Sequence, residues 1–181
     1  MKKNYLFGIL FLSVFSYGQN FGDFASGIKI NNTIYNTSGV APNQINSSFG
    51  ALDFDSQNLG FFGQNSSCAK ITGGEIKTWK NSFGNVCSAT LYWRVYPIGN
   101  LSGIFNVIPL STISDCDTNT NTFFDGLAPC SSGDQKWKEY NLNIDFVSGL
   151  IPGNYILEIY YDYTGSDASN LTCETTKYIS I

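Results

Sequence analysis

The chain contains no histidine, and this absence decides much of the chemistry that its side chains can do. Serine and cysteine nucleophiles of the triad type need a histidine base, and the common catalytic zinc sites use histidine ligands. A pair of carboxylates, as in glycoside hydrolysis, is the enzymatic arrangement that remains. Glu75 and Glu158 lie in predicted strands and are the candidates. The alternative is that both face solvent on their strands, and on this interpretation we expect no catalytic activity.

Oxygen-bearing side chains recur at every second position of one loop, which is how calcium-binding loops bring hard ligands to a single ion. The loop differs from an EF-hand, because Thr120 replaces the usual glycine and Gly126 replaces the bidentate glutamate. A polar turn explains the same residues equally well. Calcium is the one cofactor that the sequence suggests, with these ligands: Asp115, Asp117, Asn119, Asn121 and Asp125.

A third set of residues could bind a ligand through flat aromatic rings. Exposed rings on a sheet can stack on the apolar faces of sugars. Large aromatic side chains in strands also fill cores and cover sheet edges, so a structural role is the competing interpretation. The rings predicted to lie on faces turned away from the core are Trp79, Tyr92, Tyr96, Trp137 and Tyr160.

Period-2 alternation recurs along the chain and predicts the strands that must position these residues. In the segment 89–96, Leu91, Trp93 and Val95 share one face, and in 154–163 the odd-numbered residues do. Further strands are predicted at 27–35, 70–79, 104–110, 138–146 and 175–181, and the segments 70–79 and 89–96 are predicted to form a hairpin through the turn 81–85. About 7–8 short strands indicate an all-β, immunoglobulin-like antiparallel β-sandwich. Pro152 to Tyr155 resembles the tyrosine corner of such folds.

The N-terminus has the parts of a secretory signal peptide. Lys2 and Lys3 precede an apolar run from Tyr5 to Phe15, which is too short to span a bilayer. We predict a signal peptide over residues 1–18, cleavage before Gln19, and one β-sandwich domain over residues 19–181. No later apolar stretch approaches the length of a membrane helix, so no membrane span is expected.

All of the cysteines lie after the predicted signal peptide, and disulfides are the default in an exported protein. Cys116 and Cys130 flank a polar loop and are the first pair that we expect. That bridge would stabilise the fold by about 3 kcal/mol on the chain-entropy model. The count of 5 leaves one thiol free or paired between chains.

Removing Lys2 and Lys3 would leave 8 basic against 14 acidic residues, a net charge of −6. An acidic domain with a single arginine has no basic patch for a phosphate backbone, so nucleic-acid binding is not expected.

Several blocks in order resemble a β-sandwich module of secreted proteins from the Bacteroidetes, often found upstream of type IX secretion sorting domains. The blocks are Thr72–Lys80, Asn85–Cys87, Leu91–Tyr96, Pro129–Trp137 and Pro152–Glu158. The resemblance covers most of the chain after Phe21 and implies export and a sandwich fold, but no particular activity. Such proteins usually continue beyond the equivalent of Tyr178 into a sorting tail. We expect a secreted, extracellular or cell-surface location, and a periplasmic one if the sorting tail is truly absent.

Three functions therefore stand as hypotheses. The first is a secreted or cell-surface module with a non-catalytic binding or structural role, whose partner is an extracellular polysaccharide or a cell-surface protein. The second is a carbohydrate-binding module with exposed aromatic rings and a structural calcium ion. The third is a small glycoside hydrolase that uses two carboxylates.

Overall fold

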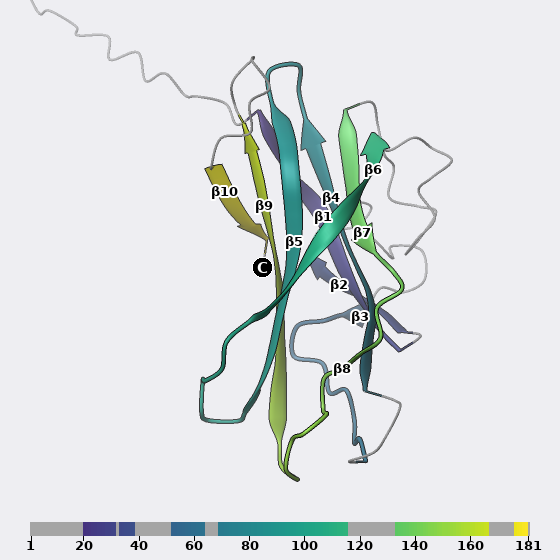
Figure 1. Cartoon of the computed structure of the whole chain (residues 1–181), viewed down its shortest axis with the longest axis vertical. Coiled ribbons are helices and arrows are strands. Elements are labelled where there is room, and N and C mark those ends of the chain that lie inside the picture. Colours follow the sequence, from purple (N-terminus) through teal and green to yellow (C-terminus); the bar gives the residue numbers. More distant parts are fainter. Residues whose placement is uncertain are drawn as a thin grey trace, which may run out of the picture.

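The computed structural model describes residues 20–31, 33–38, 52–63, 69–115, 133–166 and 176–180. These residues form strands and no helix (Figure 1). The strands are β1 (Phe21–Ile30), β2 (Thr33–Ser38), β3 (Leu52–Asp53), β4 (Lys70–Lys80), β5 (Asn85–Pro97), β6 (Asn106–Asp115), β7 (Asp134–Glu139), β8 (Ile144–Asp145), β9 (Tyr155–Ser166) and β10 (Thr176–Ser180). The predicted all-β class is confirmed.

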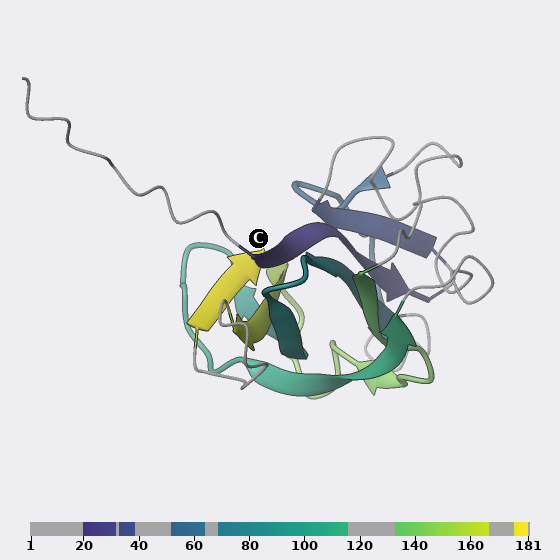
Figure 2. The same cartoon turned by 90° about the horizontal axis from the view of Figure 1, so that it is seen from above.

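The strands form one curled sheet in the order β10-β9-β5-β6-β7-β4-β1-β2-β3, with β8 paired to β4. All described pairs are antiparallel except β2 with β3. Strand β6 turns the corner, because Asn106–Leu110 pairs with β5 and the following residues pair with β7. The sheet thus has a β5 half (β10, β9, β5) and a β4 half (β7, β4, β1, β2, β3) that face each other across the core (Figure 2).

Alternate residues of β5 and β9 supply one side of this core. Leu91 and Tyr161 are fully buried, and Trp93 and Val95 pack against the same cluster. Both strands are rich in aromatic and β-branched residues, which suit a pleated, half-buried surface. The two-face patterns predicted for these strands are confirmed.

Two tyrosines of β9 reach across the core and tie the halves together. The Tyr161 hydroxyl donates to the carbonyl oxygen of Gly27 at 2.6 Å, and the Tyr163 hydroxyl donates to Asp23 at 2.9 Å. Gly74 makes room for the first contact, since a Cβ there would lie 2.8 Å from the Tyr161 hydroxyl oxygen. Complete burial raises the pKa of Tyr161, so its hydroxyl remains a donor at every physiological pH.

Replacing Tyr161 by phenylalanine should lower the free energy of unfolding by about 1–2 kcal/mol. The ring still fills its site, but the buried carbonyl of Gly27 loses its donor from β9. Urea denaturation of Tyr161→Phe measures the loss. A change within error of zero would show that this hydroxyl does not hold the two halves together.

A side-chain amide completes the sheet at the corner where β6 leaves β5. Val86 lies beyond the part of β5 that pairs with β6. Its N–H donates to Oε1 of Gln135 at 3.3 Å, and its carbonyl accepts from Nε2 of Gln135 at 3.4 Å. One side chain from β7 therefore satisfies backbone groups that would otherwise be buried without partners.

Three details of the predicted strands are wrong. Strands β4 and β5 are consecutive but not a hairpin, because β4 pairs with β1, β7 and β8 while β5 pairs with β6 and β9. The turn after β4 instead crosses between the two halves. The segment 27–35 is a hairpin of β1 and β2 that turns at Asn31, whose φ is 55°. The segment 138–146 is the end of β7 and the short β8. Alternation shows which faces are apolar but does not identify the neighbouring strand.

Candidate functional site: a groove beside strand β9

Three of the five predicted ring residues lie together on the outer face of the β5 half, namely Tyr92, Tyr96 and Tyr160. Tyr92 and Tyr160 are directly opposite on β5 and β9, and their rings stack with centroids 4.6 Å apart and planes 3° apart. Phe105 stands edge-on to both rings. Burial and the neighbouring Tyr92 raise the pKa of Tyr160.

Arg94 also packs on two rings of this cluster. Its guanidinium lies 4.2 Å from the ring centre of Phe105 and 5.2 Å from that of Tyr96. The same group holds Oε2 of Glu158 through two nitrogens, each at 2.8 Å. The rings therefore pack on one another and on Arg94 while remaining partly exposed.

The two tryptophans do not join this cluster. Trp137 is 6 % exposed and donates from its indole nitrogen to Thr78 at 3.1 Å, so its predicted outward position is wrong. It belongs to the face of β7 that packs on the core. Trp79 is half-buried and lies on Gly22, where an added Cβ would approach its indole nitrogen to 2.7 Å.

The two candidate carboxylates are not assembled into a catalytic pair. The side chain of Glu158 lies on the outer face of the β5 half, because its neighbours Leu157 and Ile159 face the core. Glu75 lies on the β4 half between Gly74 and Ile76, which face the core. The two side chains therefore point in opposite directions from the core, and the groove described below is lined by Glu158 but not by Glu75. The prediction that these two residues could act as a pair is wrong.

Glu75 belongs instead to a buried ionic cluster. Its Oε1 lies 3.4 Å from Nζ of Lys136 and 4.0 Å from Nζ of Lys77, and all three side chains are at most 1 % exposed. Desolvation lowers the pKa of Lys136, while Glu75 opposes the shift and Lys77 adds to it.

This lowered pKa gives a prediction for pH dependence. The folded state binds the Lys136 proton more weakly than the unfolded state, whose pKa is near 10.5, so stability rises with pH in the window below 10.5. The free energy of unfolding of the wild type, minus that of Lys136→Met, should therefore increase as the pH rises toward 10.5. Urea denaturation at several pH values measures the difference between the two proteins. If this difference decreased as the pH rises, the lowered pKa of Lys136 would be contradicted.

The predicted calcium site and disulfide fall mostly outside the described residues. Asp115 ends β6, whereas Asp117, Asn119, Asn121 and Asp125 lie outside the described ranges, as do Cys116 and Cys130. Within the described part of the chain, no three acidic or cysteine side chains come together as a metal site would require. Cys87 is disulfide-bonded, and its partner lies outside the described residues.

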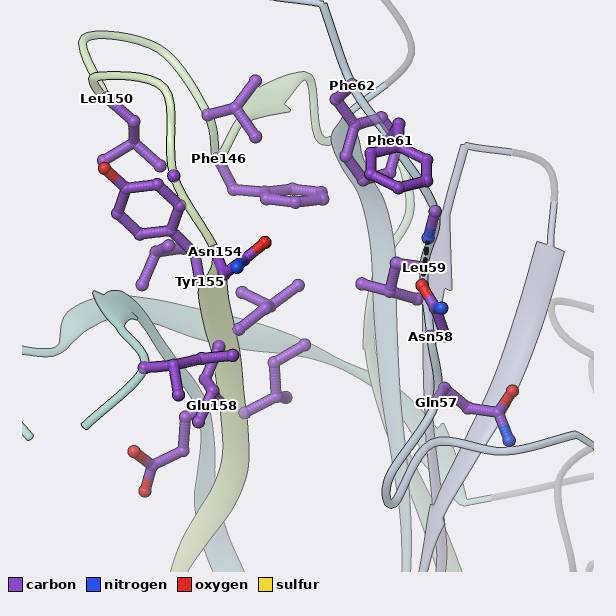
Figure 3. Close-up of a pocket in the computed structure, with 18 of the residues that line it drawn as sticks. Gln57, Asn58, Leu59, Phe61, Phe62, Phe146, Leu150, Asn154, Tyr155 and Glu158 are labelled. Carbon is purple, nitrogen blue, oxygen red and sulfur yellow. Dashed lines mark hydrogen bonds between the residues drawn. The ribbon is translucent and has the colours of Figure 1, made fainter. Parts of the chain in front are cut away.

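A groove of about 1310 Å³ lies at the end of the fold where β9 begins (Figure 3). One wall is the irregular segment 53–63 that follows β3. The other wall is the start of β9 with the loop 146–154 that leads into it. Val95 and Ile98 at the end of β5, together with Thr37 of β2, complete the lining.

Apolar side chains from both walls fill the depth of the groove. Phe62 and Phe146 meet edge to face across it, with ring centres 5.7 Å apart. Leu59 and Leu157 pack against the main core, so the groove is a place where the core opens to solvent. At the rim Phe61 is fully exposed (Figure 3).

Local turns hold the two walls in place. On one wall the carbonyl-type oxygen of Asn58 accepts from the N–H of Gly60 at 2.9 Å, and the φ of Gly60 is +92°. On the other wall the Tyr155 hydroxyl donates to the carbonyl of Ile151 at 2.8 Å. Both walls therefore have defined shapes.

The polar rim of the groove restricts the charge of a ligand. The lining includes Asp53, Asp55 and Glu158 but no lysine or arginine. Gln57 and Asn154 also line it, and their side-chain amides form no hydrogen bond within the described residues. Arg94 balances the charge of Glu158, so Asp53 and Asp55 carry the net charge of the rim. A neutral or basic ligand with apolar parts fits this surface better than an anion.

The groove was not predicted from the sequence. Phe61 and Phe62 form only a short apolar piece bounded by glycine, and residues far apart in the chain supply the two walls. A structural role was expected for Tyr155. Its hydroxyl bonds to Ile151, and the residue also lines the groove.

No family model, no curated protein and no solved structure matches this chain. In the part of the chain that the structure describes, no helix has the length and apolarity needed to cross a membrane.

Proposed function

We propose that this chain is a non-catalytic binding module of an exported or cell-surface protein, and that it holds a neutral or basic ligand in the groove beside β9. The observation that carries the proposal is the groove itself: an opening of the apolar core, about 1310 Å³ in volume, whose described lining has carboxylates and amides but no lysine or arginine. Ligand sites are typically concave and mostly apolar with a few polar groups that fix orientation.

Export is supported by two independent features. The lysines and short apolar run at the N-terminus have the pattern of a signal peptide. The disulfide at Cys87 suits an oxidising compartment, because thiols in the cytoplasm are usually kept reduced. The resemblance to secreted Bacteroidetes modules agrees with both.

A neutral polysaccharide is the second candidate ligand. The exposed ring of Phe61 can stack on a sugar, and the amides of Gln57 and Asn154 can bind hydroxyl groups. Affinity electrophoresis through a panel of neutral polysaccharides tests this class. Retardation that is lost in Phe61→Ala would support it, and equal mobility on every gel would exclude the sugars in the panel.

Binding of the neutral dye Nile red tests the groove without assuming a ligand class. We expect blue-shifted fluorescence with the wild-type protein and a several-fold weaker affinity in Phe61→Ser, because the rim loses its largest apolar side chain. The matched control is Phe83→Ser, which removes a ring that is 58 % exposed in the turn between β4 and β5, away from the groove. A folded protein that takes up no dye, or equal losses in both variants, would contradict the proposal.

A further inference from the structure

The start of β9 has an unpaired backbone edge. Strand β10 pairs with β9 only from Tyr161 to Gly165, so the part from Tyr155 to Tyr160 has β5 on one side and no described strand on the other (Figure 1). Unpaired edges of this kind are templates for another strand, and proteins usually protect them with lysine, proline or a covering segment.

The direction of the backbone groups on this edge follows from the register. The N–H of Ile98 donates to the carbonyl of Asn154 at 3.1 Å, which places the even-numbered residues of β9 in hydrogen bonds with β5. Tyr155, Leu157 and Ile159 therefore direct their N–H and C=O groups to the open side. None of the three has a backbone bond on that side within the described residues.

This open edge borders the groove. Five consecutive residues, Tyr155 to Ile159, line the groove. Their side chains alternate between the inner and outer faces of the sheet, so a space that touches all of them runs along the edge of the strand and not over one face. Across the groove, the whole segment 53–63 lines the opposite wall, as Figure 3 shows for the labelled residues Gln57 to Phe62.

We propose that an extended peptide segment of a partner protein adds to the edge of β9 at Tyr155–Tyr160 and fills the groove. This inference rests on the proposed function of the groove and names its ligand. The main chain of the peptide would bond to Tyr155, Leu157 and Ile159, and every second side chain would enter the apolar space near Leu59 and Phe146. Six residues of β9 are available, so the bound segment spans about 20 Å.

The acidic residues at the rim restrict the net charge that a bound peptide can have. Asp53 and Asp55 lie on the wall opposite β9, and the lining has no basic side chain to balance them. A segment with alternating apolar residues and a neutral or positive charge is complementary, and an acidic segment is repelled.

Selection from a phage-displayed library of random nonapeptides on the immobilised protein tests this inference. The enriched sequences should have apolar residues at alternate positions and no net negative charge. The most enriched peptide is then synthesised in two N-methylated forms, each methylated at alternate residues along one edge. One form should bind at least tenfold more weakly and the other within about twofold, since only one edge of the peptide faces β9.

The groove variants give the matched controls. Phe61→Ser should weaken binding of the unmodified peptide about fivefold, and Phe83→Ser should leave it unchanged. Absence of any enriched sequence, or equal effects of the two methylated forms, would overturn strand addition. If Nile red still binds in that case, the groove remains a ligand site for another class of molecule. Concentration-dependent self-association that the peptide cannot compete away would assign the edge to a second copy and would also overturn the proposal.

Discussion

Substitution of Gly165 by alanine should destabilise the fold by about 3 kcal/mol or more. Gly165 lies in β9 opposite Val86, at the end of the molecule away from the groove. A Cβ at this position would overlap both the ring of Phe21 and the carbonyl oxygen of Asn85. The carbonyl belongs to a paired strand and cannot rotate away, so β5 or β1 must shift. A loss of this size is a large part of the 5–15 kcal/mol that typically separates folded from unfolded states.

The control is Gly99→Ala in the loop after β5. Gly99 has a φ of +82° and no atom within 4 Å of an added Cβ, so only backbone strain of about 1 kcal/mol is expected. Urea denaturation followed by tryptophan fluorescence compares the two variants. Equal losses, or a Gly165→Ala protein as stable as the wild type, would mean that β1, β5 and β9 do not pack as closely as described.

Removal of the Glu75 carboxylate should destabilise the protein by about 3–5 kcal/mol, because it removes the anion that two buried lysines share. Nζ of Lys136 is 3.4 Å from Oε1 of Glu75, and both side chains are at most 1 % exposed. Glu75→Gln keeps the shape of the side chain and removes its charge, so most of the loss should appear in this variant as well as in Glu75→Ala.

The control for charge removal is Glu158→Gln, whose partner is Arg94. That pair is partly exposed, at 37 % and 15 %, and an ion pair near solvent contributes about 1 kcal/mol or less. Thermal and urea denaturation should therefore rank Glu75→Gln well below Glu158→Gln in stability. The reverse order would show that the buried cluster does not depend on Glu75.

The faces of single strands could be predicted from the sequence because local alternation determines them. Leu91, Trp93 and Val95 face the core as predicted, and Tyr155 makes its corner contact with Ile151. The period-2 pattern and the turn residues carry this information within a few positions.

Long-range arrangement could not be predicted in the same way. Glu75 and Lys77 alternate with core residues and have the pattern of a solvated face, yet both are fully buried. The prediction that Trp137 faces outward was wrong for a similar reason. The composition of β7 does not show which of its faces meets Thr78. The groove depends on the meeting of segments 53–63 and 146–159, which no local pattern encodes.

The open edge and the groove have one structural origin. The curled sheet ends at β10 on one side and at β3 on the other. Strand β10 protects only the part of β9 from Tyr161 onward, and β3 is followed by a segment without regular pairing. One added strand would pair the remaining edge of β9 and cover the apolar side chains below it, which is why a peptide is the occupant that the fold favours.

Amide hydrogen exchange of the free protein, measured residue by residue by NMR, tests this account most directly. Residues 156, 158 and 160 should exchange slowly because their N–H groups bond to β5, while Tyr155, Leu157 and Ile159 should exchange fast and become protected when the selected peptide binds. Uniformly slow exchange from 155 to 160 in the free protein would show that the edge is already covered, and it would contradict the account.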